Sequence, residues 1–308
     1  MIRTVLEDIS SQQLGVTYLH EHLIIDSEIV KKDFRHIYLP SAEEAIAELK
    51  ICKDAGVGAM VDCMPTASGR DIRKLAQISG QTGIHIIAAT GLHHVRYYRE
   101  DDYIVNLNAE KLANFMISEI NKGCESTEYK AGIIKIVTSG FEPTKSELCL
   151  FEAAAIAHSS TGAPILTHCE HGTGAIEQLE ILQKLNVDLK RVVLSHTDKE
   201  PDFSYHQEIL SSGVNVEYDQ SLRQISAPES TSALLTAEMV DRGFVGQIML
   251  GTDGARRSLW TTLGGTPGLS ALFTDWSKKL KEVGITNEEL RLFFVENPAK
   301  FLSFTEQK

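Results

Sequence analysis

The sequence has few cysteines, few prolines and no long apolar run. Its five cysteines include no Cys-x-x-Cys pair, which argues against both a disulfide framework and a thiolate zinc site. No apolar stretch approaches the roughly 20 residues that a membrane-spanning helix needs. The first residues also lack the apolar segment of a signal peptide. We therefore expect a cytoplasmic protein that does not bind a membrane.

Runs of lysine and arginine are also absent, and the formal net charge is −12. This argues against nucleic acid as a partner, because a phosphate backbone requires a basic face. An acidic protein can still bind an anion at one place, so a phosphorylated small molecule is compatible with this charge. Composition leaves the oligomeric state open, a homodimer included.

A Gly-x-Gly-x-x-Gly motif after the first apolar run is absent too, which counts against a dinucleotide-binding fold. Instead, short apolar runs alternate with amphipathic segments along the chain. Apolar runs of this kind are typical of parallel strands that are buried on both faces. Eight strand–helix units in about 250 residues fit a closed barrel better than an open sheet. We predict one (β/α)8 TIM-barrel domain over residues 1–308, with C-terminal helices that close it.

The expected elements follow from these periodicities. The predicted strands are 16–25, 58–63, 85–90, 132–137, 164–168, 191–195, 214–218 and 247–250. The predicted helices between them are 42–55, 72–82, 109–122, 147–161, 175–185, 203–212 and 229–242, and the closing helices are 264–283, 287–295 and 297–301. Ser41, Asp71 and Thr144 have the residue type and position of helix N-caps.

Polar side chains end several of the predicted strands. His20 and His22 end the first strand, His168 and His196 end or follow the fifth and sixth, and Asp253 follows the eighth. The carboxyl ends of barrel strands converge on one face, and side chains two apart on a strand point the same way. Imidazoles and a carboxylate that meet there are suited to a divalent metal: zinc first, with manganese, cobalt or iron as alternatives. Any one of these histidines alone would more often be a core residue, but the whole set favours a metal site.

Lys135 lies inside the apolar fourth strand, where an unpaired lysine is rare. Burial and neighbouring cations should lower the pKa of its amine. A neutral amine can react with carbon dioxide to form a carbamate, which is an anion able to bridge two metal ions. The alternatives are that Lys135 extends its ammonium to the strand end and that Asp253 only caps the following helix.

In order and strand position, these six side chains resemble the ligand set of the phosphotriesterase family of the amidohydrolase superfamily. The resemblance extends from about residue 14 to 302. It is carried by the six residues and by the surrounding motifs Leu19-His20-Glu21-His22-Leu23, Gly69-Arg70-Asp71, Thr90-Gly91, Gly251-Thr252-Asp253 and Asn297-Pro298.

The resemblance implies two divalent ions that share one bridging side chain. Carboxylated Lys135 would be this bridge, together with a hydroxide. The ligands of the more buried ion would be His20, His22 and Asp253, and those of the more exposed ion would be His168 and His196. Asp253 would also be the catalytic residue that accepts the proton of the nucleophile and passes it to the leaving oxygen.

The implied activity is hydrolysis of an ester-type bond, and a lactone ranks first. An organophosphate or aryl ester, an acyl-homoserine lactone, and a metal-bound barrel that binds or regulates without turnover are the alternatives. A deaminase of the same superfamily is more remote, since those enzymes typically use one metal and no bridging lysine.

Arginines on the loops after predicted strands three, seven and eight suggest an anionic substrate, because guanidinium groups bind phosphate bidentately. We predict a phosphorylated sugar lactone, with its phosphate held by Arg223 and by Arg256 or Arg257. The supporting substrate contacts would be Tyr97, Tyr98 and His94. Two alternatives stay open: these arginines pair with loop acids such as Asp219 or Glu100, or apolar residues such as Leu259, Trp260 and Leu263 receive an acyl chain. The remaining histidines are predicted to have loop, surface or packing roles, with a substrate contact left open for His93; they are His36, His85, His93, His158, His171 and His206.

Overall fold

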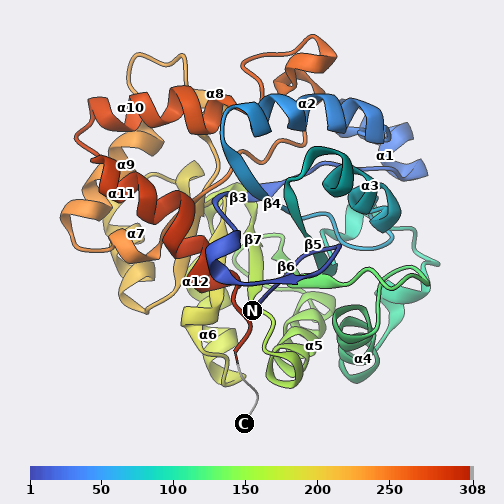
Figure 1. The fold of residues 1–308 in the computed structure, drawn as a ribbon. Coiled ribbons are helices and arrows are strands. Elements are labelled where there is room, and N and C mark those ends of the chain that lie inside the picture. Colours follow the sequence, from blue (N-terminus) through green and yellow to red (C-terminus); the bar gives the residue numbers. More distant parts are fainter. Residues whose placement is uncertain (306–308) are drawn as a thin grey trace.

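The protein is described by a computed structural model that covers residues 1–305 (Figure 1), so the last three residues of the predicted domain lie outside it. Eight parallel strands pair in chain order to form the barrel sheet of this described part. They are β3 (Val16–Glu21), β4 (Val57–Asp62), β5 (His85–Gly91), β6 (Ala131–Thr138), β7 (Ile165–Cys169), β8 (Val192–Ser195), β9 (Asn215–Tyr218) and β10 (Ile248–Leu250).

The sheet closes between its first and last strands just beyond β10. The backbone amides of Thr252 and Asp253 both donate to the carbonyl of His20 at 3.1 Å. The (β/α)8 barrel prediction is therefore confirmed. This closure also matters for function, because it lies between two of the predicted metal ligands.

Helices surround the sheet, as Figure 1 shows. They are α1 (Glu28–Asp33), α2 (Ala42–Asp54), α3 (Ile72–Thr82), α4 (Ala109–Asn121), α5 (Lys145–Thr161), α6 (Ala175–Lys184), α7 (Phe203–Ser211), α8 (Ser221–Gln224), α9 (Thr231–Asp241), α10 (Ser277–Glu282), α11 (Asn287–Arg291) and α12 (Asn297–Leu302). The three predicted N-caps are confirmed: Ser41, Asp71 and Thr144 each accept a hydrogen bond from a backbone amide of the first helical turn.

Two predicted boundaries are wrong. The first barrel strand ends at Glu21 rather than at residue 25, because the amides of Leu23 and Ile24 donate to the Asp62 carboxylate instead of to a neighbouring strand. The first closing helix begins near residue 272 rather than at 264. The segment before it contains Gly264 and Gly268, whose φ angles of 77° and 92° are incompatible with a right-handed helix. None of the helices in residues 1–305 has the length and apolar character required to cross a bilayer.

Apolar side chains fill the end of the barrel where the strands begin. Seven of the eight barrel strands contribute buried residues to this cluster, among them Leu19, Val61, Ile87, Ile133, Leu166, Val193 and Met249. A short antiparallel pair, β1 (Ile2–Arg3) and β2 (Asp8–Ile9), packs on this cluster together with α12. In Figure 1 the N-terminal segment and α12 lie together in front of the strands. This end of the barrel is a packed core, which leaves the carboxyl ends of the strands for chemistry.

Candidate metal centre

The alternation of strand side chains places Lys135 and His168 inside the barrel mouth. Ile133 and Leu166 belong to the apolar core of the barrel, and Lys135 and His168 follow them by two residues on β6 and β7. Residues two apart on a strand point to the same face. Both side chains are accordingly buried, with exposed fractions of 1% and 7%.

A register shift lies at the end of β3, where His20 and His22 meet at one site. The pairing of β3 with β4 is irregular between Tyr18 and Glu21, and such irregularities redirect side chains. His20 is the last residue but one of the strand, and His22 lies just beyond its end. Their rings are 5.3 Å apart, and the His20 ring is 4.8 Å from that of His196. The histidines therefore meet as predicted, although His22 is not on the strand itself.

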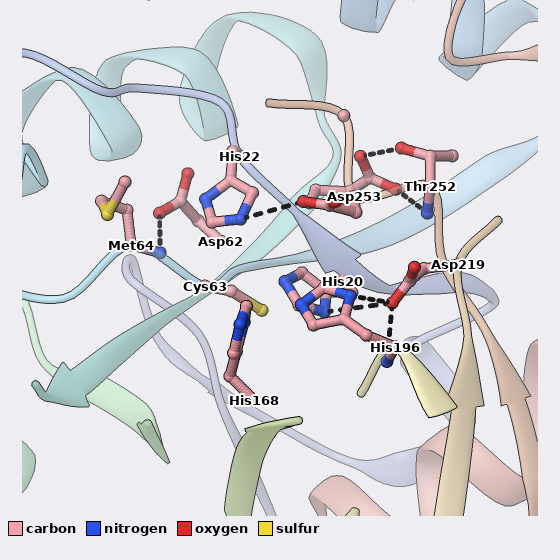
Figure 2. Close-up of polar contacts among 12 residues, drawn as sticks. His20, His22, Asp62, Cys63, Met64, His168, His196, Asp219, Thr252 and Asp253 are labelled. Carbon is pink, nitrogen blue, oxygen red and sulfur yellow. Dashed lines mark hydrogen bonds and ion pairs between the residues drawn. The ribbon is translucent and has the colours of Figure 1, made fainter. Parts of the chain in front are cut away.

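His196 and Asp253 reach the site from left-handed backbone conformations. Their φ angles are 67° and 44°, values that residues other than glycine seldom adopt. His196 directly follows β8, and Asp253 lies three residues beyond β10. Asp253 Oδ1 is 3.5 Å from His22 Nε2 (Figure 2). Non-glycine residues held in such conformations are typical of functional sites.

Several buried nitrogens at this site have no hydrogen-bond partner within residues 1–305. They are His20 Nε2, His22 Nδ1, His168 Nδ1 and Lys135 Nζ. An unpartnered buried polar atom costs free energy, so a cluster of four such atoms calls for an explanation. Ligand atoms of His20, His22 and Asp253 all lie within 4.8 Å of one another. This donor set fits a divalent cation.

Burial also keeps these nitrogens in the form that metal binding needs. It lowers the pKa of His22 to about 4, and it lowers the pKa of His20 and His168 well below the usual histidine range. Burial likewise lowers the pKa of the Lys135 amine. A neutral imidazole has a free lone pair for a metal, and a neutral amine can form the predicted carbamate.

Carboxylates orient the histidine rings from outside the cluster. Glu217 Oε2 is 3.2 Å from His20 Nδ1, and Glu170 Oε2 is 2.7 Å from His168 Nε2. In each case the opposite ring nitrogen is the unpartnered one. Carboxylates placed in this way fix the tautomer and orientation of metal-binding histidines.

Asp219 was missed as a candidate site residue by the sequence analysis, which gave it only as a loop acid. Its Oδ2 is 2.6 Å from His196 Nδ1 and 3.9 Å from His20 Nδ1, and Figure 2 shows it beside both rings. His20, His196 and Asp219 form a second group of ligand atoms within 4.8 Å. Although burial opposes it, the neighbouring His196 ring lowers the pKa of the Asp219 carboxyl. A signal was present, because Asp219 directly follows the seventh strand much as His196 follows the sixth.

A cavity of about 390 Å³ opens onto these side chains. Four of the predicted metal ligands line it: His22, His168, His196 and Asp253. The predicted substrate contacts Tyr97, Arg223 and Arg256 line it too, whereas His94, Tyr98 and Arg257 are absent from its described walls. His36 and His171 are exposed, as their predicted surface and loop roles imply, and they also line the cavity, as do His93, Arg96 and Lys199.

Three of the predicted substrate contacts have other partners. The Tyr98 hydroxyl accepts from the His93 amide, and His94 Nδ1 accepts from the Arg96 amide. Arg257 donates to the Tyr38 carbonyl at 3.0 Å and lies 3.7 Å from Glu44. These contacts stabilise the loops around the cavity.

Arg223 is bound to the segments after β9 and β10 rather than open to a ligand. Its Nη1 donates to the carbonyls of Asp219 and Thr252, and its Nη2 donates to the carbonyl and to Oδ2 of Asp253, at 2.8–3.2 Å. Four of its five N–H groups are thereby used. Pairing of the loop arginines with acids was an alternative that the sequence left open. Arg223 does pair in this way, and its partner is Asp253.

A comparison with protein families matches residues 1–302 to the phosphotriesterase family. This chain belongs to that family. The aryldialkylphosphatase of Saccharolobus solfataricus is 30% identical to it, over 96% of this chain and 98% of the relative. The phospho-furanose lactonase of Mycoplasmopsis synoviae is 30% identical, over 99% of this chain and 92% of the relative.

Solved structures of the phosphotriesterase family are also similar. A lactonase from Listeria monocytogenes superposes with a TM-score of 0.91 at 31% identity, covering 99% of both chains. The phosphotriesterase homology protein from Escherichia coli, complexed with phosphate in its active site, superposes with a TM-score of 0.88 at 30% identity, covering 94% of this chain and 99% of the other. Membership of this family confirms the predicted enzyme class, a metal-dependent hydrolase. The roles of individual residues stay predictions, for which the structure supplies the geometry.

Proposed function

We propose that this phosphotriesterase-family protein is a lactonase with two divalent ions, and that its substrate is a phosphorylated sugar lactone. The observation that carries the proposal is the set of residues that line the cavity. They include four predicted metal ligands and, beside them, exposed cationic side chains. Arg256 and Lys199 line the cavity, and within residues 1–305 neither has an ion-pair partner. A protein of net charge −12 thus offers two uncommitted cations beside its metal site.

The relatives support the same choice of substrate. One is a phospho-furanose lactonase, and the Escherichia coli structure has phosphate in its active site. The aryldialkylphosphatase supports hydrolysis of an ester-type bond, although at phosphorus rather than at a carbonyl carbon. The cavity volume of about 390 Å³ suits a small substrate of this kind.

The proposed ligands follow from the donor set. His20, His22 and Asp253 would hold one ion and His168 and His196 the other, with Lys135 as a carboxylated bridge. Zinc ranks first because imidazole nitrogens dominate the set, and manganese or cobalt remain alternatives. When bound, such ions lower the pKa of a water molecule and polarise the carbonyl oxygen of the substrate.

The protein's own residues would move and direct the proton. Asp253 lies in the cavity wall, where its carboxylate can accept a proton from the attacking water and return it to the leaving oxygen. Burial favours its neutral form, but Arg223 and His196 lower the pKa of Asp253 and keep it ionised. Arg223 holds the same carboxylate by its Oδ2 at 3.0 Å.

Of the predicted phosphate contacts, Arg256 would be retained, and Lys199 would take the place of Arg223. Tyr97, which also lines the cavity, would be a supporting donor. A long acyl chain has less support. Trp260 is only 1% exposed and its Nε1 donates to the Gly254 carbonyl, and neither it nor Leu259 is found among the described cavity-lining residues.

Arg256→Ala is expected to raise the KM for a phosphorylated lactone by about 10- to 100-fold, since a hydrogen bond to a charged group contributes about 1.5–3 kcal/mol. The KM for the same lactone without its phosphate should change less than about threefold. Arg257→Ala is the matched control, because Arg257 lies on the same loop but contacts Tyr38 and Glu44. Steady-state kinetics on both lactones, with an acyl-homoserine lactone as a third substrate, measures this.

Equal losses on the two sugar lactones would contradict the phosphate site. A parent enzyme that prefers the unphosphorylated or the acylated lactone would contradict the proposed substrate. Neither result would affect the assignment of the metal ligands.

A further inference from the structure

Two fully buried carboxylates, Glu21 and Asp62, lie beside the metal centre without lining the cavity in the described residues. Both have an exposed fraction of 0%. Each is adjacent to a predicted ligand, because Glu21 lies between His20 and His22 in the chain and Asp62 contacts the segment after His22. Figure 2 shows Asp62 next to His22, and Thr252 next to Asp253. Neither carboxylate has a role in the mechanism above.

Glu21 binds the residue that precedes Asp253. The Thr252 hydroxyl donates to Glu21 Oε2 at 2.5 Å, and the Thr252 amide lies 3.2 Å from Oε1 as a second donor. This contact joins the end of β3 to the segment after β10, where the barrel closes. Asp253 follows directly, in the left-handed conformation with a φ of 44°. A non-glycine residue keeps such a conformation only where its surroundings enforce it.

Asp62 binds the residues that follow His22. Its Oδ2 accepts from the Leu23 amide at 2.7 Å and from the Ile24 amide at 3.4 Å, and its Oδ1 accepts from the Met64 amide at 3.2 Å. These contacts end β3 and direct the chain away from the sheet immediately after His22. The position of the His22 ring therefore depends on a carboxylate from the neighbouring strand β4.

We propose that Glu21 and Asp62 are positioning residues that together set the separation of His22 and Asp253 for metal binding. Glu21 acts through Thr252 on Asp253, and Asp62 acts through the Leu23 amide on His22. The two ligands come from opposite sides of the barrel closure, and His22 Nε2 is 3.5 Å from Asp253 Oδ1. Residues that orient a ligand from outside the coordination sphere typically change metal affinity or activity by about 10- to 100-fold when they are removed.

The test uses Thr252→Val, which keeps the side-chain volume and removes the hydroxyl. The proposal rests on the metal centre assigned above, so the first readout is the dissociation constant for zinc or manganese, measured by competition with a chelating dye. Thr252→Val is expected to weaken the binding of one ion about 10- to 100-fold and to lower kcat with little change in KM. Thr252→Ser, which keeps the hydroxyl, should restore metal affinity and kcat to within about threefold of the parent.

Asp62→Asn should weaken metal binding as well, because an NH2 group replaces one of the two carboxylate oxygens. The amide nitrogen of this group cannot accept a hydrogen bond from a backbone amide.

Thr90→Val is the matched control for a purely structural effect. Thr90 lies near the end of β5, and its hydroxyl also donates to a buried carboxylate, Glu119 Oε2 of α4, at 2.7 Å. Its loss should lower the midpoint of urea unfolding to an extent similar to Thr252→Val and leave metal affinity unchanged.

Unchanged metal affinity in Thr252→Val would overturn the proposal, as would an equal loss of affinity in Thr90→Val. If Thr252→Val does not fold, the comparison of Asp62→Asn with Thr90→Val decides in the same way. If the parent enzyme does not bind two ions, the proposed metal centre itself is wrong. If the parent binds two ions and the variants bind them equally well, only the positioning role of Glu21 and Asp62 is wrong.

Discussion

Lys135→Ala is expected to lose metal and to lower kcat by about 10³-fold or more, equivalent to about 4 kcal/mol of transition-state stabilisation. The alanine removes the side chain that would bridge the two ions, and no other lysine of residues 1–305 lies within the apolar lining of the barrel strands. The two measurements are metal content after gel filtration and turnover of the preferred lactone.

Chemical rescue distinguishes a lost bridge from a damaged fold. Bicarbonate together with a short-chain carboxylic acid should partly restore metal and activity to Lys135→Ala, since either anion can occupy the space of the missing carbamate. Lys130→Ala is the matched control, because Lys130 directly precedes the same strand and is only half-buried. A Lys135→Ala enzyme with full metal content and near-parental turnover would show that Lys135 is not a bridging ligand.

Asp253→Asn is expected to keep the fold and to lower kcat by about 10²- to 10⁴-fold. The amide removes the proton acceptor, and general base catalysis typically contributes a rate enhancement of about this size. The substitution also weakens one metal ligand. Circular dichroism and thermal unfolding should remain close to those of the parent. The account of Asp253 fails if the variant turns over substrate at a near-parental rate with its metal in place.

A partner of Asp253 provides a graded version of this test. Arg223→Lys keeps the positive charge, but a lysine has no planar fork with which to bind Oδ2 and three carbonyls together. We expect kcat to fall about tenfold with little change in the KM for the phosphorylated lactone. A large rise in KM confined to that lactone would instead assign Arg223 to the phosphate.

The barrel and the positions of the candidate metal ligands could be predicted because their signals are local. Each barrel strand is a short apolar run, and polar residues such as Lys135 and His168 interrupt or end such runs at conspicuous positions. Their spacing by two from Ile133 and Leu166 also fixes the direction of both side chains. The geometry of the His20–His22 pair was less predictable, because it depends on a register shift and on Asp62, which lies on another strand.

The rest of the site depends on contacts that are distant in sequence. Arg223 was assigned to a phosphate from its loop position, and only the structure shows its donors directed at Thr252 and Asp253, about 30 residues further along the chain. Lys199 and Asp219 follow strands just as the assigned residues do, yet a single charged residue on a loop does not indicate whether it faces the cavity. The side-chain orientation on irregular loops is set by tertiary packing rather than by a periodic pattern.

The metal content of the purified protein tests the central claim most directly. After expression in medium supplemented with zinc or manganese, elemental analysis should find about two divalent ions per chain, because the structure brings together six donor side chains with a potential bridge among them. Removal of the ions by a chelator should abolish lactone hydrolysis, and their return should restore it. One ion per chain or none, in protein that hydrolyses the lactone at full rate, would contradict the account.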